Sequence, residues 1–111
     1  MNKSLTRLLI AGALAFPCLA SAQAAWPNKT VSVVVPWAPG GTTDILARML
    51  SENLTKSLGQ TFIVENKPGA SGNIGSNTVA KAKPDGYTLL VGSMSTHAMN
   101  GALFSKMPFH P

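Results

Sequence analysis

The distribution of apolar and polar residues along the chain predicts alternating strands and helices from residue 30 onward. Residues Thr30 to Val35 are mostly β-branched and end as a solidly apolar run, which is typical of a strand covered on both faces. Pro36 can end this strand because proline donates no hydrogen bond to a neighbouring strand. From Asp44 to Leu58, apolar residues recur every three or four positions, which is the spacing of an amphipathic helix. The apolar side, predicted to pack on a core, comprises Ile45, Leu46, Met49, Leu50, Leu54 and Leu58.

The predicted helix has sequence signals at both ends. Thr43 or Asp44 is expected to be its N-cap, because hydroxyl and carboxylate oxygens accept hydrogen bonds from the free N–H groups of a first turn. Asp44 has a second interpretation, as a first-turn acid that complements the helix dipole. Gly59 follows the last apolar residue and is expected to end the helix in the left-handed conformation.

The rest of the chain continues the alternation with shorter elements. Loops rich in glycine, proline and asparagine separate them. The order β-α-β-α-β has helices long enough for right-handed crossovers, and it therefore predicts an α/β fold with a parallel sheet. The expected elements are a strand at Gln60–Glu65, a loop at Asn66–Gly72, a helix at Asn73–Ala82, a type I turn at Lys83–Gly86, a strand at Tyr87–Gly92 and a third helix from His97 to Phe104.

The first 24 residues have the pattern of a secretory signal peptide. Lys3 and Arg7 precede an apolar run from Leu8 to Ala20, which is too short to cross a bilayer as a permanent helix. Small residues then alternate as they do before a cleavage site, and we expect cleavage after Ala24. No other run is long enough to span a membrane, so the sequence predicts a soluble product in the periplasm.

Cys18, the single cysteine, leaves one alternative for the exported chain. It would be the lipidated first residue of a lipoprotein, although Phe16 and Pro17 stand where such signals have small residues. If Cys18 is removed with the signal peptide, the exported chain has no cysteine. It then has no disulfide and no thiolate chemistry.

The charge of the chain argues against a nucleic-acid-binding protein. The formal net charge of +5 falls to +3 without Lys3 and Arg7, because seven bases then face four acids. The remaining lysines are scattered, and no basic stripe alternates with aromatic residues. A modest positive balance suits a small anionic ligand but is a weak indication.

Two loops that follow predicted strands contain the candidate ligand-binding residues. In open α/β sheets, ligands bind beyond the carboxyl ends of the strands, and a helix N-terminus favours an anionic group. The first loop offers glycine backbone and small hydroxyl groups, and the second is a polar loop after the third strand. We therefore predict a pocket for a small carboxylate. Its residues are Ala38, Pro39, Gly40, Gly41, Thr42, Thr43 and Asp44 in the first loop, and Ser93, Ser95, Thr96 and His97 in the second.

The second loop also contains the residue types of a hydrolase, with Ser93 or Ser95 as nucleophile and His97 as base. However, the stretch from Gly92 to Thr96 is not the Gly-x-Ser-x-Gly nucleophile elbow. Serines in a loop beyond a strand are common anion-binding donors. We expect a binding protein without catalytic residues, and a small secreted α/β hydrolase is the alternative.

The sequence indicates neither a metal nor a cofactor. His97 and His110 are the only histidines, and no exported cysteine or clustered pair of acids accompanies them. Gly69, Gly72 and Gly75 have the spacing G-x-x-G-x-x-G, which differs from the dinucleotide fingerprint, and no acid follows where a ribose would need one. We assign these glycines to packing between the loop and the next helix.

A family resemblance is carried by Pro27-x-Lys29, Val34–Asp44, Leu58–Gln60, Val64–Ala70, Gly72–Gly75, Lys83–Thr88, Ser95–Ala98 and Pro108–Pro111. Together these segments resemble the amino-terminal part of Bug-type receptors, the periplasmic solute-binding proteins of tripartite tricarboxylate transporters. The resemblance runs in order along the chain with few gaps. It covers essentially everything after the predicted signal peptide.

The resemblance implies a two-domain periplasmic binding protein of the type II class, which captures its ligand by domain closure and hands it to membrane transporter subunits. In such receptors the loops after the first and third strands hold a carboxylate of the ligand, largely through backbone groups and bridging water. Those loops correspond to Ala38–Asp44 and Ser93–His97 here. Family members are far longer, so we expect residues 25–111 to be the amino-terminal part of a first domain, truncated and impaired in binding. A non-functional gene remnant is a further possibility.

Overall fold

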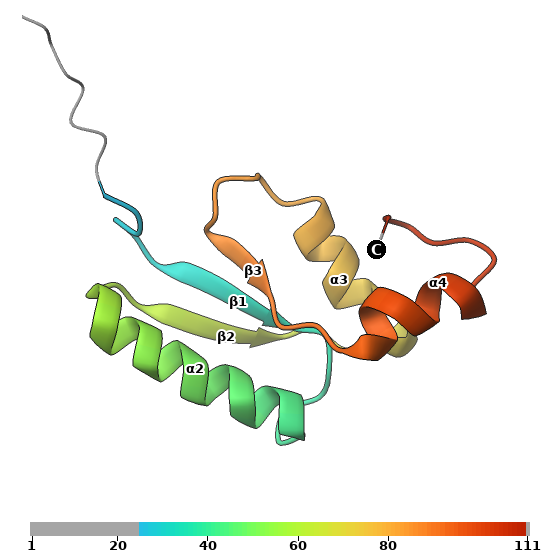
Figure 1. The fold of residues 1–111 in the computed structure, drawn as a ribbon, viewed down its shortest axis with the longest axis horizontal. Coiled ribbons are helices and arrows are strands. Elements are labelled where there is room, and N and C mark those ends of the chain that lie inside the picture. The colour runs from blue at the N-terminus through green and yellow to red at the C-terminus, as the bar shows by residue number, and fades with distance from the viewer. Residues whose placement is uncertain (1–24, 111) are drawn as a thin grey trace, which may run out of the picture.

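The computed structural model describes residues 25–110, which form an α/β fold around a three-stranded sheet (Figure 1). The strands are β1 (Val31–Val35), β2 (Phe62–Asn66) and β3 (Thr88–Leu90), all parallel, in the order β2-β1-β3. The parallel sheet and the element order confirm the predicted fold class. The predicted signal peptide, residues 1–24, lies outside the described residues.

β1 is the central strand, and its composition explains its position. Four of its five residues are valines, each no more than 3% exposed. Val33 is paired with Val64 of β2 on one side and with Leu89 of β3 on the other. A strand with neighbours on both edges and helices over both faces suits a continuous apolar run.

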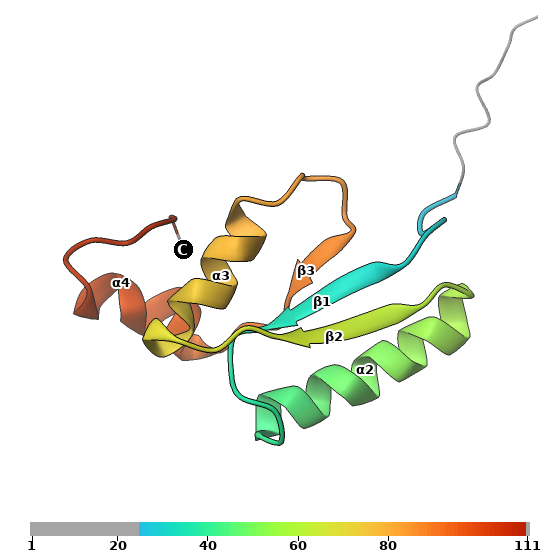
Figure 2. The same ribbon diagram turned by 180° about the vertical axis from the view of Figure 1, so that it is seen from behind.

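Two helices, α2 (Thr42–Leu58) and α3 (Asn73–Ala80), connect the strands and cover the sheet. The chain moves from β1 to β2 in one direction and from β2 past β1 to β3 in the other. Right-handed connections therefore place the two helices on opposite faces. α2 lies along β2 and β1, whereas α3 lies along β3 and β1 (Figures 1 and 2). The core under α2 is formed by Val31, Val33 and Phe62, with Leu54, Val64, Tyr87, Leu89 and Val91 partly buried against them.

α2 begins two residues earlier than predicted, and its N-cap is Gly41. The predicted N-cap at Thr43 or Asp44 is therefore wrong. Gly41 has no side chain to cap the helix, and the carboxylate of Asp44 in the first turn accepts the N–H of Gly40 instead. At the other end Gly59 has a left-handed φ of 70° and donates its N–H to the carbonyl of Thr55, which confirms the predicted helix end.

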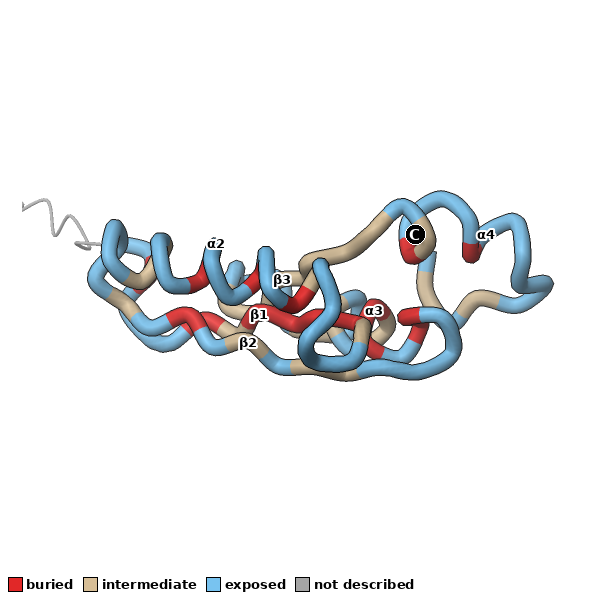
Figure 3. Tube along the Cα trace, turned by 90° about the horizontal axis from the view of Figure 1, so that it is seen from below, coloured by how far each residue is buried: buried red, intermediate tan, exposed pale blue. Residues whose placement is uncertain are grey.

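The side of α2 that packs on the sheet differs from the prediction. Four of the six predicted core residues are more than half exposed: Ile45, Leu46, Met49 and Leu50. The buried residues are Asp44, Ala47 and Ser51, whose short side chains let the helix lie close to the strands. Figure 3 shows buried positions on the side of α2 that faces the strands and exposed positions on its outer side. The periodicity identified the helix, but not which of its sides is covered.

The remaining elements differ from the prediction mainly at their ends. β2 includes Asn66, which its composition had placed in the following loop. No helix among residues 25–110 is long and apolar enough to span a membrane. The other elements are a 3₁₀ turn at Ala70–Gly72, α3 ending at Ala80, and a π-helical turn at Ser95–Met99 that continues as α4 (Asn100–Leu103).

The first described residues are anchored at the amino-terminal edge of the sheet. Trp26 packs edge-on against Phe62 and tilted against Tyr87, with ring centroids 6.4 and 6.2 Å apart. The N–H of Asn28 donates to the Tyr87 hydroxyl over 3.0 Å, and that hydroxyl donates to the Asn28 side chain over 2.8 Å. These contacts lie at the edge opposite the candidate ligand loops, and they tie residues 26–28 to the first residue of β2 and to Tyr87, which directly precedes β3.

Candidate functional site

The carboxyl ends of the three strands meet at one edge of the sheet because the strands are parallel. Backbone hydrogen bonds continue to the residue after each outer strand. The N–H of Lys67 donates to the carbonyl of Val35 over 2.8 Å, and the N–H of Val91 donates to the carbonyl of Val34 over 3.0 Å. The segments after β1, β2 and β3 therefore start side by side. The first and third contain the predicted ligand loops, and the middle segment is one to which sequence reasoning gave only a packing role.

Gly72 marks the point where the three segments touch. A side-chain carbon added at Gly72 would lie 2.6 Å from the Thr96 side chain and 3.3 Å from the Trp37 ring. Its φ of +85° also favours glycine. Asn100 holds the adjacent turn by donating to the carbonyl of Ser71 over 2.8 Å. The start of the segment after β1, at Pro36 and Trp37, thus lies close to the second predicted loop around the segment after β2.

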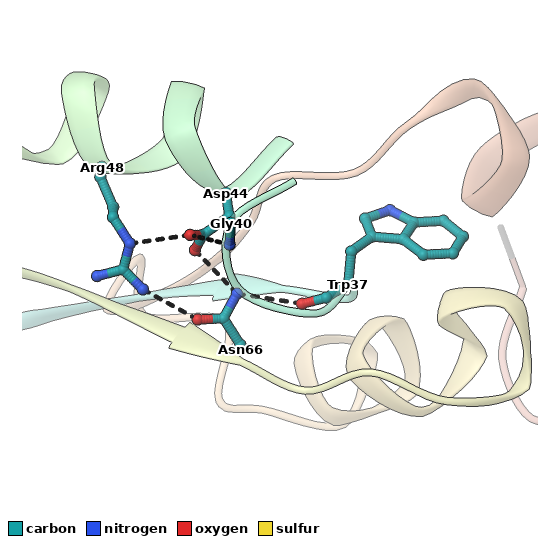
Figure 4. Close-up of polar contacts among 5 residues, drawn as sticks. All are labelled: Trp37, Gly40, Asp44, Arg48 and Asn66. Atoms are coloured by element: carbon teal, nitrogen blue, oxygen red, sulfur yellow. Dashed lines mark hydrogen bonds and ion pairs between the residues drawn. The ribbon is translucent and has the colours of Figure 1, made fainter. Parts of the chain in front are cut away.

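The first loop is held by the carboxylate of Asp44, which is only 3% exposed (Figure 4). Its Oδ2 accepts the N–H of Gly40 over 2.9 Å and Nε of Arg48 over 3.0 Å. Its Oδ1 accepts Nδ2 of Asn66 over 2.9 Å. The hydrogen bond from Arg48, followed by those from Gly40 and Asn66, lowers the pKa of Asp44 from 3.8 to about 2. Asp44 is therefore ionised at neutral pH, and both of its oxygens are used within the protein.

Asn66 connects this network to β2. Besides Asp44, its Nδ2 donates to the carbonyl of Trp37 over 3.1 Å, and its Oδ1 accepts Nη2 of Arg48 over 3.1 Å. In Figure 4 the Trp37 ring points away from these contacts. Sequence reasoning missed both Asn66 and Arg48 as site residues. The sequence signal for them was weak. Asn66 is one polar residue after a predicted strand, and Arg48 is one base four positions after the acid Asp44.

The N-terminus of α2 presents backbone N–H groups that have no helical partner. The first hydrogen bond of the helix runs from the N–H of Ile45 to the carbonyl of Gly41, over 3.0 Å. The N–H groups of Thr42, Thr43 and Asp44 come before it and therefore lack acceptors within the helix. Residues 38–42 are exposed, so this positive end of a 17-residue helix is open to solvent. Such an arrangement can bind a small anion.

The second loop is stabilised from within by Thr96. The Thr96 side chain is fully buried, and its hydroxyl donates to the carbonyl of Ser93 and accepts the N–H of Ser93, each over 2.9 Å. The Ser93 hydroxyl oxygen is buried without a hydrogen-bond partner among the described residues. Ser95 is partly buried. His97 lies against Gly92 and lines a cavity of about 160 Å³ formed by Ser76, Val79, Ala80, Leu90, Phe109 and His110.

The arrangement of these side chains is not that of a hydrolase. The backbone N–H of His97 donates to the Ser93 carbonyl over 3.2 Å, but within residues 25–110 no hydrogen bond joins the His97 imidazole to the hydroxyl of Ser93 or of Ser95. A serine nucleophile requires a base within hydrogen-bonding reach. The same part of the chain has no group of three or more histidine, cysteine or acidic residues that could hold a metal ion.

Comparison with known proteins identifies relatives among the receptors of tripartite tricarboxylate transporters. A sequence model described as "Tripartite tricarboxylate transporter family receptor" matches residues 46–111. A protein from the TAR-I ttuE-ttuC' intergenic region of Agrobacterium vitis is 38% identical over 111 residues, which is all of this chain and 32% of the relative. Protein BugT of Bordetella pertussis is 44% identical over 86 residues, covering 78% of this chain and 26% of BugT. The chain thus spans between a quarter and a third of the length of these relatives.

Three solved structures are similar to this chain over 78% of its residues and 29% of their own. A structure described as a periplasmic transporter is 48% identical with a TM-score of 0.76. A protein from R. palustris solved with adipate is 43% identical with a TM-score of 0.75. MatC from Rhodopseudomonas palustris with bound malate is 46% identical with a TM-score of 0.74.

Proposed function

Because the chain belongs to the receptor family of tripartite tricarboxylate transporters, we propose that it supplies the carboxylate-binding loops of a periplasmic solute receptor. The ligand is a small dicarboxylate or a related acid, in keeping with adipate and malate in two similar structures. Residues 1–24 direct export, residues 25–111 belong to the first domain, and the intact receptor passes its ligand to the membrane subunits of the transporter.

One observation carries this proposal: the first N–H groups of α2 have no acceptor within the helix, and they lie beyond the same carboxyl-end edge of the sheet from which the loop after β3 begins. A ligand carboxylate at this point accepts hydrogen bonds from the backbone of the first loop, and water can bridge the remaining distance. Asp44 does not oppose the ligand strongly, because its charge is buried behind the loop and paired with Arg48. Backbone recognition of this kind accepts many acids.

We divide the predicted site residues between two proposed roles. We assign ligand contact to the backbone and hydroxyls of Ala38–Thr43, of which residues 38–42 are exposed, and to Ser93 and Ser95. Asp44 and Thr96 support the loops, since their polar side-chain atoms are already hydrogen-bonded within the protein. His97 faces the cavity beside α3 and contributes to the shape of the second loop.

A ligand titration followed by backbone amide chemical shifts tests the proposal. Adipate and malate are expected to shift the amides of residues 40–44 and 93–96, while the amides near Trp26 and Gly86, at the opposite edge of the sheet, stay unchanged. Adipamide, a neutral molecule of the same length as adipate, is the matched control and should cause no shift. Equal shifts with adipate and adipamide, or shifts spread over both edges, would contradict a carboxylate site at these loops.

A further inference from the structure

The loop between β1 and α2 is held by side chains that lie outside it. Its residues 38–41 are exposed and therefore have little packing of their own. Two hydrogen bonds fix its course between the strand and the helix: the Trp37 carbonyl accepts Nδ2 of Asn66, and the Gly40 N–H donates to Asp44. Both bonds belong to one hydrogen-bond network, because Asn66 also donates to Asp44.

We propose that Asn66 is a positioning residue of the carboxylate site, acting with Arg48 through Asp44 to hold the loop in its binding conformation. This inference rests on the proposed function, because it concerns the same site. Asn66 belongs to β2, where it is paired with Val35 of β1. It therefore fastens the loop to the longer of the two strand pairings in the sheet.

An asparagine is the residue that this position requires. Its Nδ2 faces two acceptors, the Trp37 carbonyl and the Asp44 carboxylate, and its Oδ1 faces a donor, Nη2 of Arg48. The donor and acceptors together fix the orientation of the side-chain amide. Aspartate has the same shape but no N–H to donate, and it would place a second carboxylate beside Asp44. An aliphatic residue would leave Oδ1 of the buried Asp44 without the donor that Asn66 provides.

Holding the loop in advance matters because a flexible loop must be ordered when a ligand binds. The ordering cost is subtracted from the binding free energy, so a loop that is already fixed binds more tightly through the same contacts. The backbone of the first loop is the proposed source of those contacts. The effect of Asn66 on affinity is therefore indirect, and it should be visible in the free protein as protection of the Gly40 N–H.

The test compares Asn66→Ala and Asn66→Asp with the wild-type chain and with Asn53→Ala. Asn53 is the matched control, because its amide also donates to a backbone carbonyl, that of Met49, over 2.8 Å, but on the exposed side of α2. We expect Asn66→Ala to speed hydrogen exchange at Gly40 and to weaken adipate binding, each by about tenfold. Asn53→Ala should change neither.

Exchange at the amides of Val33 and Val34 separates positioning from general destabilisation. These core amides should keep wild-type protection if Asn66 acts on the loop, and should lose it if the whole fold loosens. Should Asn66→Ala or Asn66→Asp fail to fold, Arg48→Lys serves instead. It keeps a positive charge near Asp44 but loses the forked contact to Asn66, and it should accelerate Gly40 exchange to a smaller extent.

The outcomes distinguish this inference from the function on which it rests. If the wild-type chain binds adipate and the Asn66 variants bind it equally well with Gly40 still protected, the positioning role is overturned and the proposed function stands. A wild-type chain that does not respond to adipate overturns the proposed function, and with it any role of Asn66 in ligand affinity. Loss of Gly40 protection together with weaker binding, at unchanged core protection, supports the inference.

Discussion

Asp44 is the residue on which the polar contacts of the first loop converge. Its carboxylate is buried and receives hydrogen bonds from Gly40, Arg48 and Asn66. A carboxylate near a bound anion would be unfavourable if it were exposed and unpaired. Here Arg48 offsets its charge, and three donors satisfy its oxygens. In the proposed site, the acid thus shapes the loop without itself facing the ligand.

From the lowered pKa of Asp44 we expect a specific dependence of protein stability on pH. Its pKa is about 2 in the folded protein, below its ordinary value of 3.8, so the unfolded chain binds the proton more readily. The stability that Asp44 contributes is complete above pH 4 and is lost as the pH falls from about 4 towards 2. Urea unfolding should therefore show a steeper loss over this range in the wild-type chain than in Asp44→Asn.

Glu52→Gln is the matched control for that experiment, because Glu52 lies on the same helix in an exposed pair with Lys56. The hydrogen bond from Lys56 and its charge also lower the pKa of Glu52, but solvent screens the pair. We expect Glu52→Gln to follow the wild-type curve closely. If the stability of Asp44→Asn also followed the wild-type curve between pH 4 and pH 2, the buried network would not account for the acid sensitivity.

At the scale of elements, the order of strands and helices could be predicted because each element has its own period. The valine run of β1 and the three- and four-residue spacing of α2 are local signals. The covered side of α2 could not be predicted in the same way. Asp44 counts as polar in any pattern, and its burial depends on Asn66, which is distant in sequence and joins it only when β2 lies beside β1.

From the packing of α2 we expect effects of very different size at two residues that are close in sequence. Ala47 is fully buried against the sheet, so Ala47→Met should overpack the contact and lower the free energy of unfolding by about 1–3 kcal/mol. Met49 is 57% exposed on the outer side, so Met49→Ala should change that free energy by less than about 0.5 kcal/mol. Denaturant unfolding of the two variants measures both values. A large loss in Met49→Ala with a neutral Ala47→Met would restore the orientation predicted from the sequence.

At the scale of the whole molecule, the proposed site draws on three segments that are separate in the sequence. Predicting parallel strands was enough to place the loops after β1 and β3 at the same edge. The contribution of the end of β2 and of the segment after it was not foreseen, because Asn66 and Gly72 lie in a stretch whose composition indicates only a loop. Their roles follow from close approach: Asn66 reaches the Trp37 carbonyl, and Gly72 leaves room for Trp37 and Thr96.

The openness of this edge predicts the affinity of the chain itself. The first loop is exposed, so a ligand bound there is covered by the described residues on one side. Small-molecule sites gain affinity by burying most of the ligand surface, and one-sided contact with a dicarboxylate should give a dissociation constant of ~1 mM, or about −4 kcal/mol. The similar structure solved with adipate is several times longer, since the match covers 29% of it, and we expect that protein to bind at least about a hundredfold more tightly. Titration calorimetry of both proteins with adipate in the same buffer measures the difference. Micromolar binding by the chain of residues 25–111 would mean that the three segments at this edge form a complete site by themselves.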